Sequence, residues 1–270
     1  WECPDFFNID GKNVLVISPQ EVRATKDGFY NGNNTAFLIG EYDKENKKFN
    51  REKTKVIDFG LDFYAPQTFE DKDGRRIMIG WMHSWENRII PNEFKWCGMM
   101  TIPRELRIKH GKILQCPVRE IEKYHRNAVC YQDKEISGNC QLEGICGRVL
   151  DMTVEIVRGD FRQFTISLAR NERYHTDFTI LKDSNMVEID RTYSGMVHDT
   201  IAIRKAKMKT STDKLQLRFI LDKYSVEIFL NDGQQVLSST FYTPIEADGI
   251  RFVCDGKAVV NIQKYDIVVD

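Results

Sequence analysis

Apolar and polar residues alternate with a period of two along most of the chain, in short runs that end at Gly, Asn or Asp. Successive side chains of a β-strand point to opposite faces, so this alternation predicts strands with one buried face. The sequence therefore predicts an all-β protein. In its first half the strand-like runs are residues 14–18, 35–42, 64–69, 77–82 and 98–103, with hairpin signals at Asp73-Gly74 and His110-Gly111.

Turn signals become denser after residue 127. Residues 231–233 (Asn-Asp-Gly) predict a tight hairpin, because all three tolerate positive φ. Many short antiparallel strands over about 140 residues are typical of a β-sandwich. The expected strands are residues 164–168, 215–221, 226–230, 236–242, 250–254 and 259–269.

The alternation is interrupted at residues 118–125. They follow Pro117 and place apolar residues at helical spacing, which predicts a short linking helix. We therefore expect a first domain over residues 1–117, a linker over residues 118–126 and a β-sandwich domain over residues 127–270.

The charge balance and the cysteines limit the possible partners. The chain has 39 basic and 40 acidic residues, which argues against binding to nucleic acid or to a membrane surface. No apolar run reaches the roughly 20 residues that span a bilayer. Seven cysteines without Cys-x-x-Cys spacing predict reduced thiols and no metal site. We expect a cytoplasmic protein, with secretion as the alternative if a leader precedes Trp1.

Five stretches carry chemical information. They are residues 1–5 (Trp-Glu-Cys-Pro-Asp), 62–69, 74–82, 100–106 and 221–233. In this order they resemble the motifs of glycoside hydrolase family 32, which contains invertases, sucrose-6-phosphate hydrolases and fructan hydrolases. The resemblance implies a five-bladed β-propeller followed by a β-sandwich, a fructoside substrate and no cofactor.

The resemblance implies that Glu2, in a Glu-Cys-Pro motif, is the acid/base catalyst. A retaining glycosidase uses two carboxyl groups about 5 Å apart. The family's nucleophilic aspartate lies in a Trp-x-Asn-Asp-Pro motif and a second aspartate lies in an Arg-Asp-Pro motif, and this sequence contains neither. We therefore expect the chain to form the last blades of the propeller plus the sandwich, and to be inactive alone.

Further residues of these motifs are candidates for sugar binding. Asp62 and Tyr64 are two apart, so on a strand they would share one face. The resemblance implies that both line the fructose subsite, where Tyr64 bonds a catalytic carboxylate, and a turn aspartate with a core tyrosine is the alternative. Trp81 is expected to contact the sugar ring or to pack in the core. Trp85 and Trp96 are expected either to line a leaving-group subsite or to pack against other residues.

Other conspicuous residues are expected to be structural. Cys3 is a small packing residue, because no histidine pattern that would activate it is discernible. Arg104 and Glu105 are expected to fix the last blade through ion pairs or hydrogen bonds. The basic run at residues 204–209 is expected to form a solvated sandwich edge, and a phosphate-binding role at a distance from the motifs is the alternative.

Two functions from different classes remain open at this point. The first is a β-fructofuranosidase fragment whose complete form hydrolyses sucrose, sucrose-6-phosphate or fructan. The second is a non-catalytic carbohydrate-binding or structural fragment, which self-associates or assembles with an N-terminal partner fragment that covers exposed blade edges.

Overall fold

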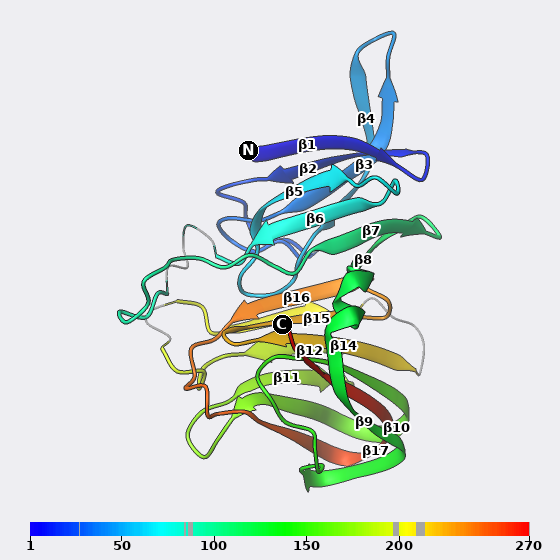
Figure 1. Cartoon of the computed structure of the whole chain (residues 1–270). Helices are drawn as coiled ribbons and strands as arrows, with labels where there is room; N and C mark the ends of the chain where they lie inside the picture. Colours follow the sequence, from blue (N-terminus) through cyan, green and yellow to red (C-terminus); the bar gives the residue numbers. More distant parts are fainter. Residues whose placement is uncertain (27, 84, 86–88, 197–199, 209–213, 270) are drawn as a thin grey trace.

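The computed structural model of the chain describes residues 1–26, 28–83, 85, 89–196, 200–208 and 214–269. Within these ranges the regular elements are β-strands apart from one 3₁₀ helix, and the strands pair into three antiparallel sheets. Two small sheets lie above a larger one (Figure 1). No helix among the described residues has the length and the apolar composition to cross a bilayer.

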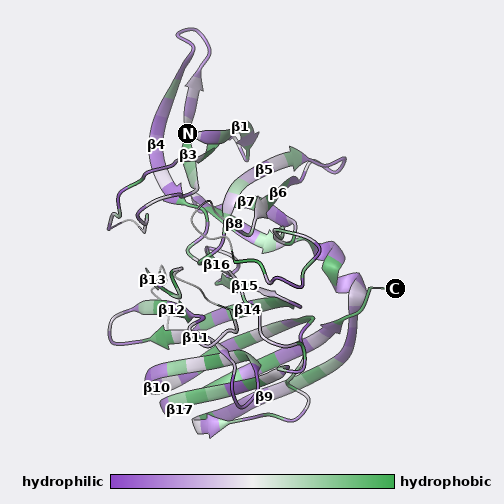
Figure 2. Cartoon of the chain, turned by 90° about the vertical axis from the view of Figure 1, so that its left-hand side faces the viewer, coloured by the Kyte–Doolittle hydropathy of each residue, from purple (hydrophilic) through white to green (hydrophobic). Residues whose placement is uncertain are grey.

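The first sheet is a four-stranded antiparallel meander, the architecture of one propeller blade. Its last two strands form a hairpin that projects away from the body of the molecule (Figure 1), and the fourth strand is hydrophilic along most of its length (Figure 2). The strands, in the order in which they pair, are β1 (Glu2–Ile9), β2 (Lys12–Ser18), β3 (Ala36–Asp43) and β4 (Lys48–Val56).

The second sheet is a second blade with the same order of strands. Its tight turns lie at the predicted hairpin signals, where Gly74 and Gly111 both have positive φ. The strands are β5 (Tyr64–Glu70), β6 (Arg76–Trp81), β7 (Arg104–Lys109) and β8 (Lys112–Pro117).

The strand predicted at residues 98–103 is wrong. Met100 forms only an isolated bridge with Trp81, and regular pairing begins at Arg104. The physical reason is Pro103, which has no backbone N–H and so cannot donate to a strand ladder.

A shared apolar core joins the two blades. Side chains from β1, β2 and β3 pack with side chains from β6 and β7, and the cluster includes Phe7, Val16, Phe37, Met78 and Leu106. Their packing against one another is the arrangement of adjacent propeller blades.

The third sheet folds over on itself as a β-sandwich, which confirms the predicted fold. The long strand β10 (Leu150–Arg170) pairs with β14 through its first half and with β11 through its second half, so it passes from one layer into the other. Phe178 and Phe219 meet edge to face between the layers, with centroids 5.6 Å apart. The strands are β9 (His125–Cys140), β10 (Leu150–Arg170), β11 (Thr176–Leu181), β12 (Met186–Asp190), β13 (Ile203–Lys207), β14 (Leu215–Asp222), β15 (Ser225–Leu230), β16 (Gln235–Thr240) and β17 (Gly249–Ile267).

The long strands of the sandwich differ from the prediction. The strands expected at residues 250–254 and 259–269 are one strand, β17, which pairs with β10 along its length. Gly256 suggests a turn, but it lies where the register shifts between Cys254 and Lys257, at a bulge inside the strand. A glycine in a strand therefore marks a bulge here and not an end.

The predicted linking helix is present as a 3₁₀ helix, η1 (Arg119–Tyr124). It buries Ile121 against Ile220 and Phe229 of the sandwich. The segment that connects the second blade to the sandwich is therefore held on the sandwich by a small apolar contact.

Backbone contacts join the blades to the sandwich. The connection between β4 and β5 pairs with β16, because Phe59 N donates to Val236 O and Leu61 N donates to Ser238 O, both at 2.8 Å. On the other side, the predicted hairpin at residues 231–233 packs on β8. A Cβ atom at Gly233 would lie 1.7 Å from the Gln115 carbonyl oxygen, so only glycine fits.

Candidate active site

Two β-bulges position the predicted catalytic residue and its neighbour. The register of β1 shifts between Glu2 and Asp5, and that of β5 shifts between Tyr64 and Gln67. Each bulge contains a residue other than glycine at φ +49°, Cys3 in β1 and Ala65 in β5. Such a backbone costs on the order of 1 kcal/mol per residue and is common at functional sites.

The Glu2 carboxylate is held through one oxygen. Oε2 accepts hydrogen bonds from the Tyr64 hydroxyl and from Gln20 Nε2, both at 2.9 Å, and it lies 3.4 Å from Trp85 Nε1. Among the described residues no group donates to Oε1. The carboxylate is therefore fixed in orientation and keeps one oxygen available to a bound molecule.

Tyr64 is suited to this role because its proton is retained. Its side chain is buried, and burial together with the hydrogen bond to Glu2 raises the pKa of the Tyr64 phenol. A neutral phenol donates a hydrogen bond, so Tyr64 orients Glu2 as long as the carboxylate is charged. The carbonyl oxygen of Ser18, at 3.2 Å, is the longer alternative acceptor.

Trp81 lies beside this carboxylate. It pairs directly with Tyr64 across β5 and β6, and its ring contacts Trp85 edge to face with centroids 5.7 Å apart. His83 lies next to the Trp81 ring, and burial lowers the pKa of His83. Glu2, Tyr64, Trp81 and Trp85 therefore form one cluster at the end of the two blades.

Asp62 is not in this cluster. β5 begins at Tyr64, so Asp62 lies in the preceding loop and the expected common strand face is not observed. The Asp62 carboxylate is fully buried and accepts hydrogen bonds from Arg191 at 2.5 Å and from Thr240 N and Oγ1 at 2.7 and 2.8 Å. Its place in the sugar subsite stays a prediction, and these contacts favour a structural role.

Trp96 also lies apart from Glu2. Its ring stacks on Phe94 with centroids 4.7 Å apart, and both rings contact Tyr224 of the sandwich. Of the two roles expected for Trp96, these contacts favour packing over lining a leaving-group subsite.

Sequence reasoning missed the polar residues that support the cluster. Gln20 lies two residues beyond the end of β2, next to Ser18, which pairs with Glu2, and this antiparallel pairing is the signal that could have found it. Asp5 Oδ2 accepts hydrogen bonds from Thr68 N at 2.8 Å and Thr68 Oγ1 at 2.6 Å, which ties β1 to β5.

The thiols have no visible part in the chemistry. All seven cysteines are free, and burial raises the pKa of the Cys3 thiol, which disfavours a thiolate. No group of three or more His, Cys, Asp or Glu side chains in the described part of the chain is arranged to hold a metal ion.

Comparison with known families identifies this arrangement. The model of the "Glycosyl hydrolases family 32 N-terminal domain" matches residues 1–117, and the model of "Glycosyl hydrolases family 32 C terminal" matches residues 120–268. The chain belongs to glycoside hydrolase family 32. The family predicted from the motifs is confirmed, and the two blades and the sandwich correspond to the fold of family 32 structures.

Individual family 32 proteins show how much of the fold is present. The sucrose-6-phosphate hydrolase of Staphylococcus xylosus is 32% identical over 273 residues, which covers 99% of this chain and 54% of that protein. The structure of sucrose-6-phosphate hydrolase from Lactobacillus gasseri matches with a TM-score of 0.85 at 23% identity, covering 99% of this chain and 55% of that one.

A β-fructofuranosidase of Bombyx mori matches with a TM-score of 0.78 at 26% identity, covering 99% of this chain and 54% of that one. A variant of it has been solved in complex with sucrose. The chain spans about half the length of the relatives it matches.

The bond between Tyr64 and Glu2 can be measured in this chain without any substrate. We expect Tyr64→Phe to lower the free energy of unfolding by about 1–2 kcal/mol, because the hydrogen bond to a charged acceptor is lost. Urea unfolding measures the change. Tyr42→Phe is the control, since the Tyr42 ring is exposed and its hydroxyl has no partner in the described structure. Equal effects of the two substitutions would show that the bond contributes nothing.

Proposed function

We propose that this chain supplies the acid/base part of the active site of a retaining β-fructofuranosidase, with Glu2 as the acid/base residue. The observation that carries the proposal is the 2.9 Å hydrogen bond from the buried Tyr64 hydroxyl to Glu2 Oε2. It fixes a single partly exposed carboxyl group at the end of two blades, beside the indole N–H of Trp85.

The chemistry follows from the cleavage of a glycosidic bond. A carboxyl group at Glu2 donates its proton to the oxygen of the departing sugar, and the resulting carboxylate later removes a proton from the attacking water. Tyr64 holds Oε2, so Oε1 is the oxygen that faces the substrate. Trp81 offers an apolar surface to a sugar ring, whose C–H faces are apolar.

The substrate class is inferred from the names of the relatives, and the cytoplasmic location from the seven free thiols. Two of the relatives reported above are sucrose-6-phosphate hydrolases, and the Bombyx mori enzyme is a β-fructofuranosidase. We place the substrate among sucrose, sucrose-6-phosphate and fructans, and the protein in the cytoplasm. The limits of residues 1–117, 118–126 and 127–270 are kept as the proposed domains, and the position of η1 at the end of the blades supports them.

We expect the 270-residue chain alone to be inactive. A proton donor without a nucleophile cannot form the fructosyl intermediate, and the two aspartate motifs of the family are not in this sequence. Incubation of the purified chain with sucrose or sucrose-6-phosphate, followed by an assay for glucose or glucose-containing products, measures this. Turnover at an ordinary enzymatic rate that Glu2→Gln abolishes would contradict the expectation.

Exposed apolar side chains favour the second candidate, an assembly with a partner chain that covers the blades. Trp1, Phe6 and Phe69, on or next to β1 and β5, are 75%, 47% and 52% exposed. Such side chains are typical of a surface that another element covers. Sedimentation velocity at increasing concentration distinguishes a self-associating chain from one that stays monomeric.

A further inference from the structure

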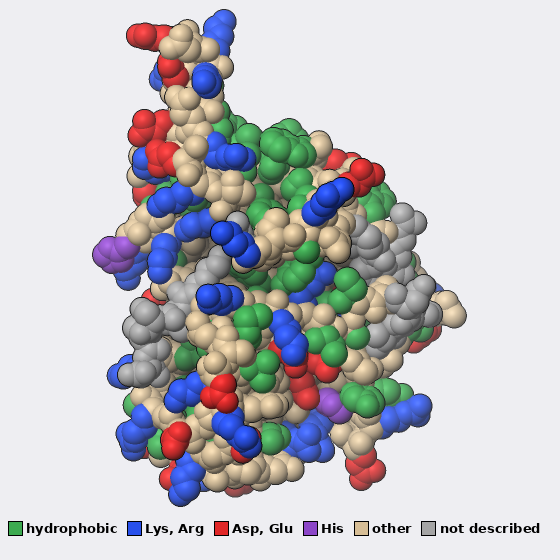
Figure 3. Space-filling model, turned by 180° about the vertical axis from the view of Figure 1, so that it is seen from behind, with side chains coloured by type: hydrophobic (Ala, Val, Ile, Leu, Met, Phe, Trp, Pro, Cys, Tyr) green, Lys and Arg blue, Asp and Glu red, His purple; other side chains and the backbone are tan. Residues whose placement is uncertain are grey.

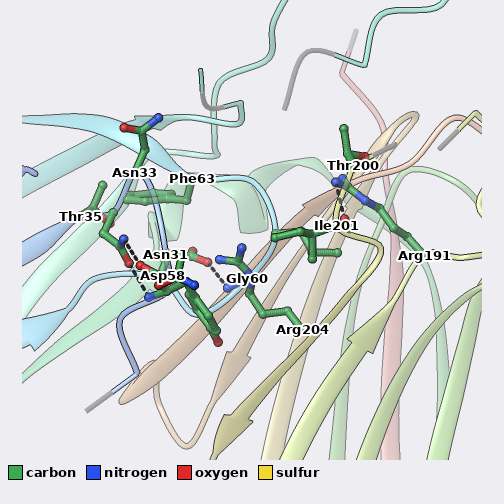
Figure 4. Close-up of a pocket in the computed structure, with 13 residues that line it drawn as sticks. Asn31, Asn33, Thr35, Asp58, Gly60, Phe63, Arg191, Thr200, Ile201 and Arg204 are labelled. Atoms are coloured by element: carbon green, nitrogen blue, oxygen red, sulfur yellow. Dashed lines mark hydrogen bonds between the residues drawn. The ribbon is translucent and has the colours of Figure 1, made fainter. Parts of the chain in front are cut away.

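A polar cavity of about 90 Å³ lies between the first blade and the sandwich, apart from the Glu2 cluster. It is lined by residues of the loop between β2 and β3, of the connection between β4 and β5, and by Arg191, Thr200, Ile201 and Arg204 of the sandwich (Figure 4). Its polar lining includes Asn31, Asn33, Asp58, Arg191, Thr200 and Arg204.

The acidic groups around the cavity already have partners. Asp58 Oδ1 accepts hydrogen bonds from Gly60 N and Ser238 N at 2.8 and 2.9 Å, and Oδ2 accepts from Ser238 Oγ and Arg104 at 2.7 and 3.1 Å. Asp62 forms its ion pair with Arg191. The negative charges near the cavity are therefore compensated by groups other than Arg204.

Arg204, on β13, has no such partner. Its guanidinium stacks on the Tyr30 ring at 3.7 Å from the centroid, and no carboxylate of the described residues lies within ion-pair distance. Figure 4 shows the side chain reaching from the sandwich toward Gly60 of the blade connection. The Arg204 side chain is half-buried, and a cation that is partly withdrawn from water without a counterion favours an anion beside it.

A second donor faces the same cavity. Asn31 Oδ1 accepts a hydrogen bond from Ala24 N at 2.9 Å, which leaves the Asn31 amide NH₂ without a partner in the described structure. The cavity thus offers donors from Asn31 and Arg204 with no acceptor assigned to them.

The surroundings add positive charge. A neighbouring hollow shares Tyr30, and its described lining residues include four lysines, Lys26, Lys55, Lys205 and Lys207, of which Lys205 pairs with Glu188 at 2.7 Å. Tyr30 also donates a hydrogen bond to Lys205 O at 2.9 Å, which fixes the ring that carries Arg204. Lys and Arg side chains gather across the middle of the back face, between the blades and the sandwich (Figure 3).

We propose that this cavity binds a compact oxoanion, a free phosphate or a phosphate monoester, which pairs with the Arg204 guanidinium and accepts a hydrogen bond from the Asn31 amide. Arginine presents a planar fork of donors that matches the geometry of phosphate oxygens. The lysines beside Tyr30 attract the anion to this part of the surface. A bound anion joins the blade to the sandwich, so binding raises the thermal stability of the chain.

The test is thermal unfolding and calorimetric titration of the intact chain with sodium phosphate, with sodium chloride of equal ionic strength as the reference. At a phosphate concentration ten times Kd we expect Tm to rise by about 3 °C above the chloride reference. Arg204→Gln is expected to weaken phosphate binding at least about tenfold. Arg162→Gln, which removes an exposed arginine paired with Asp255, leaves Kd unchanged.

A second variant covers the case in which Arg204→Gln fails to fold. Asn31→Asp places a carboxylate beside Arg204, so we expect it to raise Tm without phosphate and to abolish the effect of phosphate. Glycerol 3-phosphate serves as the monoester probe. Tighter binding of this probe than of phosphate assigns a monoester site, and the reverse assigns a free-phosphate site. An equal Tm in phosphate and chloride, or an equal loss of binding in Arg162→Gln and Arg204→Gln, overturns the proposal.

Discussion

Arg104→Met is expected to lower the free energy of unfolding of the chain by about 3–5 kcal/mol. The Arg104 side chain has no exposed surface, and it donates to Glu227 at 2.6 and 2.9 Å and to Asp58 at 3.1 Å. It also donates to Gln115 at 3.0 Å and Ser238 at 2.6 Å. Methionine fills much of the volume but leaves two buried carboxylates without a cation. Chemical denaturation followed by intrinsic fluorescence measures the loss.

The pH dependence separates a lost charge from a simple packing defect. Burial raises the pKa of the Glu227 carboxyl, although Arg104 acts against this shift. A raised folded-state pKa means that the contribution of Glu227 to stability is complete below its unfolded value and is lost as the pH rises through the folded value. Removal of Arg104 raises the folded-state pKa further. The deficit of Arg104→Met should therefore be larger at pH 8 than at pH 5.

Arg107 provides the matched control on the same strand, β7. Its side chain is 60% exposed and pairs with Glu105 at 3.1 Å, so Arg107→Met should change stability by less than about 0.5 kcal/mol. Addition of Glu227→Gln to Arg104→Met should restore part of the loss at pH 8, because one uncompensated carboxylate is removed. Equal losses in the two arginine variants, independent of pH, would contradict the assigned role.

The sequence predicts the local role of Arg104 but not its partners. The motif at residues 100–106 indicates a structural arginine, and the structure shows one that joins the second blade to the sandwich. Glu227 is 123 residues away, and alternation along β15 does not say which strand of another sheet will face it. Glu105, its neighbour in the motif, instead pairs with Arg75 and Arg107.

Sequence patterns likewise predict only the part of the candidate site that does not depend on long-range contacts. Period-two alternation locates most strands, and the motifs identify Glu2, Tyr64 and Trp81, which the structure brings together. Asp62 lies in the loop before β5, where alternation along a strand does not determine the direction of a side chain, so its place in the sugar subsite stays a prediction. Gln20 has no pattern of its own, since its contact depends on the pairing of β1 with β2.

The basic run shows that a pattern that predicts exposure can include a half-buried residue. β13 is indeed the edge strand of its sheet, as expected for residues 204–209, of which Lys209 lies outside the described residues. Arg204 nevertheless turns inward onto Tyr30, and this contact comes from a blade loop that is 174 positions earlier in the chain (204 minus 30). Periodicity within one segment carries no information about such a neighbour.

Glu2→Gln is expected to lower kcat for sucrose by about 100- to 10,000-fold in a complete active site, the usual contribution of a general acid/base. The active site can be completed by a chimera, in which this chain is joined to the part of the Staphylococcus xylosus relative that it does not match. The glutamine keeps the size of the side chain and can still accept the hydrogen bond from Tyr64, but it has no acidic proton to transfer to the leaving oxygen. Initial rates of glucose release from sucrose measure the loss, and circular dichroism verifies the fold.

The leaving group distinguishes an acid/base role for Glu2 from any other defect. Nitrophenolate leaves a nitrophenyl fructoside without protonation, so the glutamine variant should still form the fructosyl intermediate and release a burst of nitrophenolate. Slow turnover should follow, because water then attacks without a general base. Glu70→Gln is the control, because Glu70 lies exposed on β5 in a surface pair with Arg76 at 3.2 Å. Should the variant lose sucrose and the nitrophenyl substrate to the same degree without a burst, Glu2 would act in binding or folding and not in proton transfer. A burst that only Glu2→Gln shows would place the acid/base chemistry at the start of β1, where one bulge and the Tyr64 hydroxyl orient a single carboxylate.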